Sequence, residues 1–110
     1  MELIIEDVRQ DYIDYGIFSS GTRVGVLQTV ESGGSAFIRH IHVEDGHKRN
    51  GYAGMAVREL VEEHLSVRFC ITGHSASAFP FWMAFMEKCR EDGMETRNVR
   101  GDIWEIRKER

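Results

Sequence analysis

Apolar and polar residues alternate through much of the first 43 positions, with the period of two that is typical of strands. Short apolar runs at 3–5, 12–18, 23–30 and 36–43 are separated by turn-forming residues, with Ser-Ser-Gly at 19–21 and Gly-Gly at 33–34. In the last run, one face of the strand is expected to carry Phe37, Arg39, Ile41 and Val43, and the other Ile38, His40 and His42. The pattern predicts a hairpin over 12–30 within an antiparallel meander.

The period changes to that of a helix after this meander. Small and apolar residues recur three and four positions apart at Ala53, Ala56, Val57, Leu60, Val61 and His64. We then expect a strand over 67–72, a second helix that is capped by Ser77 and has Pro80 in its first turn, a stop at Asp92 and Gly93, and a last strand over 102–107. This order predicts a mixed α/β fold with a largely antiparallel central sheet and flanking helices.

Composition narrows the class of protein. The 110 residues predict a single domain over 1–110, and 42% hydrophobic and 29% charged residues are typical of a globular chain. A net charge of −4 argues against a nucleic-acid binder. We see no signal peptide and no apolar stretch long enough for a membrane span. Cys70 and Cys89 fit no metal or redox spacing, so we expect reduced thiols in a cytoplasmic protein.

A short basic loop, 47–54, lies between the strand over 36–43 and the first helix. Unpaired N–H groups at a helix start attract anions, and Lys48 and Arg49 add positive charge beside them. Gly51 and Ala53 let the backbone approach a phosphate closely. An ordinary basic turn is the alternative, but the strands before the loop and the strand, helix and strand after it favour a pyrophosphate site.

The loop resembles the acyl-coenzyme A loop of the GNAT superfamily of N-acetyltransferases, Gln/Arg-x-x-Gly-x-Gly/Ala, with Lys48 in the first position. This resemblance implies a GNAT-like fold and transfer of an acetyl group from acetyl-coenzyme A directly to an amine. It implies that the cofactor contacts Lys48, Arg49, Asn50, Gly51, Tyr52, Ala53 and Gly54 through its pyrophosphate. It further implies that a splayed strand binds the pantetheine arm through the backbone of Ile41, His42 and Val43.

The catalytic residues of the family are not in their usual places. Residues 75–82 resemble the family pattern Asn-x-x-Ala-x-x-Phe-Tyr, but Trp82 replaces the tyrosine that serves as general acid, and a register through 85–88 also lacks it. The family's carboxylate position falls at Phe37. His42 and His74 are therefore our candidates for the catalytic base, with His40, Glu6, Asp14 and Glu44 as further options.

Two further features bear on partners. His40, His42 and His47 lack a further ligand with convincing spacing, so we expect no metal site. Only residues 9–11 separate the first two strands, where the family usually carries two helices. The resulting open acceptor face fits a protein lysine or N-terminus, or a site completed by a second copy in a homodimer. The alternatives are a catalytically weak or inactive module that binds coenzyme A or a protein partner, and an assembly subunit.

Overall fold

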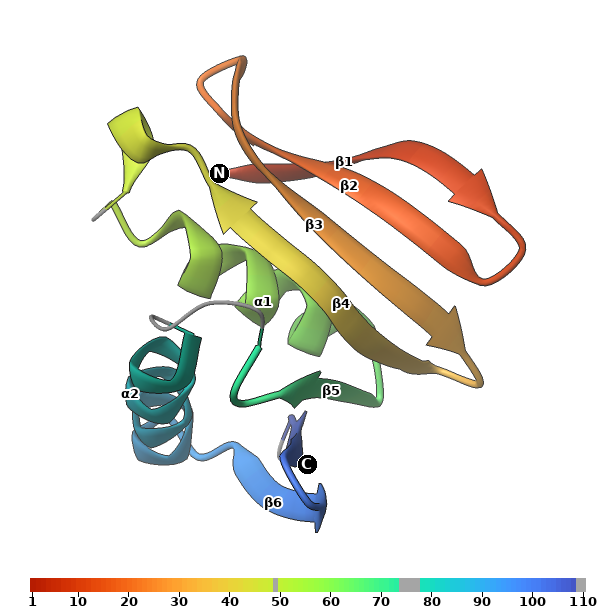
Figure 1. Ribbon diagram of the computed structural model, residues 1–110, viewed down its shortest axis with the longest axis vertical. Helices are drawn as coiled ribbons and strands as arrows, with labels where there is room; N and C mark the ends of the chain where they lie inside the picture. Colours follow the sequence, from red (N-terminus) through yellow and green to blue (C-terminus); the bar gives the residue numbers. More distant parts are fainter. Residues whose placement is uncertain (49, 74–77, 109–110) are drawn as a thin grey trace.

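A computed structural model describes residues 1–48, 50–73 and 78–108. Within these ranges the chain forms one seven-stranded sheet in the order β1-β2-β3-β4-β5-β7-β6 (Figure 1). The strands are β1 (Glu2–Arg9), β2 (Tyr12–Ser19), β3 (Thr22–Ser32), β4 (Ser35–Val43), β5 (Ser66–Cys70), β6 (Glu95–Arg100) and β7 (Ile103–Arg107). The helices are the 3-10 turn η1 (Asp45–His47), α1 (Tyr52–Glu63) and α2 (Ala78–Glu91).

The sheet is antiparallel except where β4 meets β5. This arrangement confirms the predicted mixed α/β fold and the meander of β1 to β4. The parallel pair is joined by a crossover that contains α1, as parallel neighbours require. β1 passes directly into β2 through Gln10 and Asp11, so the two helices usual at this point in the family are absent, as the sequence predicted.

Both helices pack against one face of the sheet, and Figure 1 views the sheet with α1 behind it. The buried helical residues are those that the periodicity predicted: Ala56, Val57, Leu60 and Val61 on α1, and Trp82, Phe85, Met86 and Cys89 on α2. Phe69 of β5 stacks on Trp82 with 3.9 Å between ring centroids. The opposite face of the sheet, here called the open face, carries alternate residues such as Tyr12, His40 and His42, all exposed.

A β-bulge in β4 changes which of its residues face the helices. Gln28 pairs with His40 but Thr29 pairs with Ile38, so Arg39 is an extra residue in β4. The prediction that Phe37 and Arg39 share a face with Ile41 and Val43 is therefore wrong, because the extra residue shifts the alternation by one. His40 and His42 share a face as expected, with stacked rings 6.3 Å apart.

One strand was missed by the sequence analysis. β6 pairs only with β7 at the edge of the sheet, and four of its six residues are exposed. Its sequence, Glu-Thr-Arg-Asn-Val-Arg, has no apolar alternation because neither face of this edge strand is deeply buried. The predicted order therefore lacks one strand near its end.

The second helix ends as predicted. Gly93 adopts a left-handed φ of 88°, and the N–H of Met94 donates to the carbonyl of Cys89 at 2.9 Å, which closes the last turn. Pro80 lies in the first turn of α2, where it costs no helical hydrogen bond. The predicted cap, Ser77, lies outside the described residues.

Candidate functional site

The parallel strands β4 and β5 separate after a short paired segment. They pair only between Ser35–Phe37 and Ser66–Arg68, although β4 continues to Val43 (Figure 1). On the side of β4 that faces β5, the backbone N–H and C=O groups beyond Phe37 therefore have no strand partner. Such an edge can take an extended ligand as an added strand.

A groove of about 430 Å³ lies where the strands separate. Its lining combines residues of the helix-covered face with residues of the open face, and therefore joins the two faces of the sheet. The lining residues are Phe37, Ile38, Arg39, His40, Ile41, His42, Phe69, Cys70, Gly73, Ala78 and Trp82. A ligand that entered from the helix side would thus meet a second ligand that approached from the open face.

The start of α1 lies beyond the end of β4, after η1 and the basic loop. Gly51 is its N-cap, with a left-handed φ of 77° that favours glycine, and the amide of Met55 makes a 3.0 Å bond to its carbonyl. No side chain caps this end, and the first turn contains no acidic residue. The N–H groups of Tyr52, Ala53 and Gly54 are those that an α-helix leaves without internal partners, so this end favours an anion.

The remaining loop residues are placed as follows. Lys48 is exposed and its Nζ lies 3.1 Å from Asp45. A surface pair of this kind contributes little, so the Lys48 charge stays available to an anion. Asn50 is exposed. The Tyr52 hydroxyl lies 3.0 Å from the Ser19 hydroxyl, which ties the start of α1 to the β2–β3 hairpin. Arg49 lies outside the described residues.

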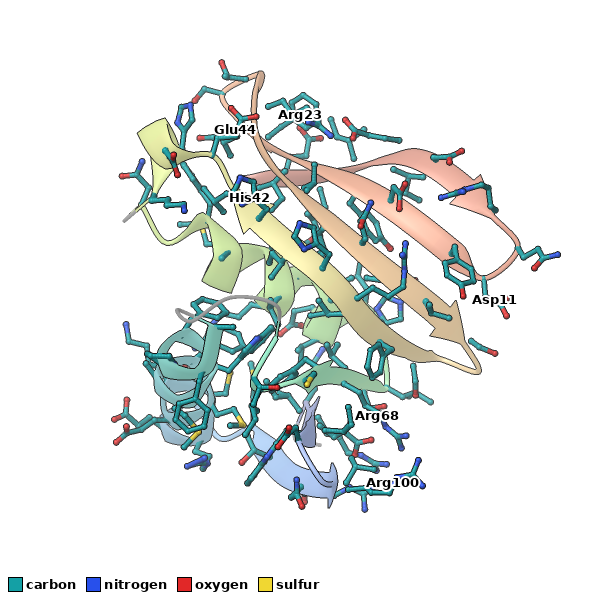
Figure 2. All side chains as sticks on the ribbon, viewed as in Figure 1. Asp11, Arg23, His42, Glu44, Arg68 and Arg100 are labelled. Carbon is teal, nitrogen blue, oxygen red and sulfur yellow. The ribbon has the colours of Figure 1, made fainter. Side chains whose placement is uncertain are left out.

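The structure brings together only part of the predicted site. Ile41 and His42 line the groove, whereas Val43 is buried at the end of β4. Figure 2 shows His42 at the end of β4 that leads toward η1, with Glu44 just beyond it. His42 is exposed on the open face, where an approaching acceptor can reach it. His74 lies outside the described residues.

Two of the carboxylates considered as bases are held in ion pairs. Glu6 accepts hydrogen bonds from Arg23 at 2.8 and 2.6 Å, and hydrogen bonding to Arg23 is the main cause that lowers the pKa of Glu6. Asp14 lies 3.4 Å from Arg39, whose guanidinium also covers the Tyr12 ring at 4.7 Å. Neither carboxylate lines the groove, so neither is placed to take a proton there.

Cys70 is a groove residue that the sequence analysis did not assign to the site. Its thiol lies 3.2 Å from the Thr72 hydroxyl, and this hydrogen bond lowers the pKa of Cys70. Cys70 and Cys89 are both free, as the sequence predicted. The available signal was position: Cys70 ends the strand that follows the first helix, close to the segment in which His74 was considered. Trp82 is buried, as expected of a core residue, and also lines the groove.

Metal-binding clusters and membrane-spanning helices are both absent from the described residues. No group of three or more His, Cys, Asp or Glu side chains there could hold a metal ion. No helix in the same ranges is long and apolar enough to cross a membrane.

No protein-family model and no curated protein sequence matches the chain. Solved structures do match. Escherichia coli YhhK, an N-acetyltransferase with bound coenzyme A, gives a TM-score of 0.65 at 14% identity over 93% of this chain and 76% of that chain. A GNAT-family acetyltransferase from Bacteroides thetaiotaomicron gives 0.61 at 9% identity over 87% and 60%. The ribosomal-protein-S18-alanine N-acetyltransferase of Escherichia coli gives 0.58 at 16% identity over 90% and 68%.

This chain thus spans about 60% of the Bacteroides protein and larger shares of the other two. The agreement with these structures extends over 87% to 93% of this chain. The chain therefore has the fold of the GNAT acetyltransferases.

Proposed function

We propose that this protein transfers an acetyl group from acetyl-coenzyme A to an amine. The observation that carries the proposal is the separation of β4 from β5 beside an uncapped helix start. An unpaired strand edge and a site for a diphosphate, placed in succession along the chain, suit a long ligand with an anionic end. Coenzyme A bound to YhhK, which has the same fold, supports this choice of ligand.

In this proposal, the pyrophosphate is held by Lys48, Arg49 and Asn50 together with the amides of Gly51, Tyr52, Ala53 and Gly54. The left-handed Gly51 fits, because among the described residues a Cβ there would meet nothing nearer than Met55 Cε at 3.9 Å, so these residues leave room for a ligand. The pantetheine arm lies along the unpaired edge of β4 at Ile41, His42 and Val43. Bound acetyl-coenzyme A supplies an activated thioester carbonyl, which unpaired β4 amides can polarise.

The acceptor amine must lose a proton when it attacks the thioester carbon. We assign His42 as the base, acting directly or through one water, because its imidazole lines the groove and is exposed on the open face. His74 stays a sequence prediction for the same role. We assign no general acid, and we infer that catalysis relies mainly on positioning the amine against the thioester.

A module that binds coenzyme A without turnover is the second candidate. It is favoured by the engagement of Glu6 and Asp14 in ion pairs away from the groove, and by tryptophan in place of the family's tyrosine at position 82. The two candidates differ in one measurement. Release of free thiol from acetyl-coenzyme A over a broad panel of amines and peptides supports the transferase, whereas binding without thiol release supports the inactive module.

Cofactor binding is best tested by calorimetric titration of acetyl-coenzyme A into the wild-type chain and two charge variants. We expect binding that Lys48→Glu weakens about tenfold, because a cation at the pyrophosphate becomes an anion. Lys88→Glu, on an exposed position of α2, makes the same charge change away from the loop and should leave the affinity unchanged. Absence of binding at millimolar cofactor would contradict the proposal.

A further inference from the structure

A cluster of arginines surrounds one buried carboxylate on β7. Glu105 has a fully buried side chain and accepts Nε–H bonds from Arg68 at 2.9 Å, Arg97 at 2.9 Å and Arg107 at 2.8 Å. Each arginine donates its Nε–H to Glu105, so its two Nη groups remain for other partners. The three side chains are 40%, 58% and 48% exposed, so these donors can reach a ligand.

Strand register puts a fourth arginine on the same face. Glu105 of β7 pairs with Arg68 of β5 on one side and with Arg97 of β6 on the other. Ile103 of β7 pairs in the same way with Cys70 and Arg100. Residues directly opposite each other share a face, so these pairs lie together. We call Arg68, Arg97, Arg100 and Arg107 the arginine patch. It lies on the open face, because the intervening Phe69 packs on Trp82 of α2 on the other side.

The patch carries more cations than carboxylates. Its four arginines face Glu105 and Glu95, with Asp102 in the adjoining turn, and Arg100 makes no ion pair within the described residues. A hollow of about 280 Å³ opens among Glu95, Thr96, Arg97, Glu105 and Arg107. A local positive excess on a chain of net charge −4 favours an anionic partner at this place.

The patch is close to the groove in which the acyl group would react. Arg68 lies two residues from Cys70 along β5, about 7 Å, and Arg100 lies two strands away, about 10 Å. Figure 2 shows Arg68 and Arg100 near each other at the lower end of the sheet. An extended peptide advances about 3.4 Å per residue, so carboxylates two to four residues from an amine in the groove would reach these guanidinium groups.

We propose that the amine acceptor belongs to an acidic polypeptide segment, whose carboxylates bind the arginine patch while its amine enters the groove from the open face. This inference rests on the proposed transferase function. A polypeptide fits better than a small acid, because the four arginines extend over three strands and no described helix encloses them. It fits better than a nucleic acid, because the net charge of −4 repels a long polyanion.

The test compares two fluorescent decapeptides with free N-termini, one with Asp and Glu at positions two to five and the other with Asn and Gln there. Binding is measured by anisotropy with coenzyme A present, so no turnover is required. We expect the acidic peptide to bind at least tenfold more tightly, and Arg100→Glu to reduce this preference below threefold. Lys88→Glu, an equal charge change on α2, should preserve it.

The possible results distinguish failure of the peptide site from failure of the cofactor site. Equal affinity for both peptides, or an oligonucleotide of equal charge that binds as tightly as the acidic peptide, would overturn the inference. Binding of coenzyme A without any peptide preference refutes the peptide site and leaves the cofactor site intact. If the chain binds the acidic peptide but does not bind coenzyme A, the transferase is refuted and the peptide site stands. Raising the salt concentration should weaken the binding of the acidic peptide more than that of the Asn/Gln peptide, because its contacts with the arginines are exposed.

Discussion

Glu31 and Glu105 are two shielded carboxylates in one sheet, and their surroundings differ in kind. Glu31, 14% exposed, accepts hydrogen bonds from Tyr15 and Thr29 at 2.6 Å and lies 2.7 Å from Nε2 of His64. Glu105 is surrounded by three arginines. The first network uses mostly neutral donors to satisfy one charge, whereas the second concentrates cations on the open face. A buried carboxylate can therefore join elements or organise a surface, according to its partners.

The Glu31 network joins α1 to the sheet. His64, the residue after α1, has Nδ1 2.9 Å from the carbonyl of Leu60 and Nε2 2.7 Å from the Glu31 carboxylate, so both ring nitrogens lie beside oxygen atoms. Burial alone would raise the pKa of Glu31, but hydrogen bonds from Thr29, Tyr15 and His64 lower it overall. Burial and the bond to Glu31 also raise the pKa of Tyr15.

Replacing Glu105 should have the largest effect on stability. Glu105→Ala removes three charge-assisted hydrogen bonds and leaves the arginines without a counter-charge. Since the arginines are about half exposed, they can turn to water, and we expect a loss of about 3 kcal/mol. Urea unfolding measures this loss, with Glu91→Ala on the exposed end of α2 as the control. A loss below about 1 kcal/mol would mean that the arginines do not depend on Glu105.

Acidification should cause the second largest loss of stability. Burial alone would raise the pKa of Glu105, but hydrogen bonds from Arg97, Arg68 and Arg107 lower it to about 2 from the ordinary 4.5. A carboxyl group with a lowered pKa contributes stability that is complete above its unfolded value and lost as the pH falls through its folded value. We therefore expect about 2 kcal/mol to be lost between about pH 5 and pH 2.

The pH effect is measured by urea unfolding at several pH values in the wild type and in Glu105→Gln. The variant lacks the titrating group, so its stability should fall less over the same interval, with the remaining slope due largely to Glu31, whose pKa is also lowered. Parallel curves for the two proteins would show that Glu105 does not titrate differently on folding.

The Glu31 and His64 pair should show a smaller, coupled effect. A double-mutant cycle of Glu31→Gln and His64→Asn isolates their interaction, which we expect to be about 1 kcal/mol, because both side chains are mostly buried. Exposed carboxylate–cation pairs have smaller interaction energies. Thermal unfolding of the four proteins at pH 7 measures the coupling, and additive effects of the two changes would contradict a direct bond in solution.

The elements that could be predicted are those whose pattern is local. The helical faces of α1 and α2 repeat every three to four residues, and β2 to β4 are separated by turn-forming residues. β6 could not be predicted, since its charged residues belong to the arginine patch and its edge position buries little. The bulge at Arg39 depends on pairing with β3, so the sequence of β4 alone was compatible with regular alternation.

In the candidate site, too, the local features could be predicted and those that depend on distant residues could not. The basic loop and its glycine are contiguous, so a motif of six residues was sufficient to indicate them. The groove depends on where β4 stops pairing with β5, and Cys70 enters it for that reason. Both carboxylate networks join distant residues, because Arg68 and Glu105 are 37 positions apart in the sequence and Glu31 and His64 are 33 positions apart. No local pattern carries such a pairing.

The smallest expected effect tests whether burial, and not distance, separates these carboxylates from an ordinary ion pair. Glu62 lies 2.8 Å from Nζ of Lys108, the same separation as Arg107 and Glu105, but both side chains are 53% exposed. Water already solvates both charges, so Glu62→Gln should cost less than about 0.5 kcal/mol. Urea unfolding beside Glu105→Ala makes the comparison direct. A cost for Glu62→Gln near that of Glu105→Ala would show that proximity alone sets the strength of these pairs, and that the shielding of Glu105 contributes little.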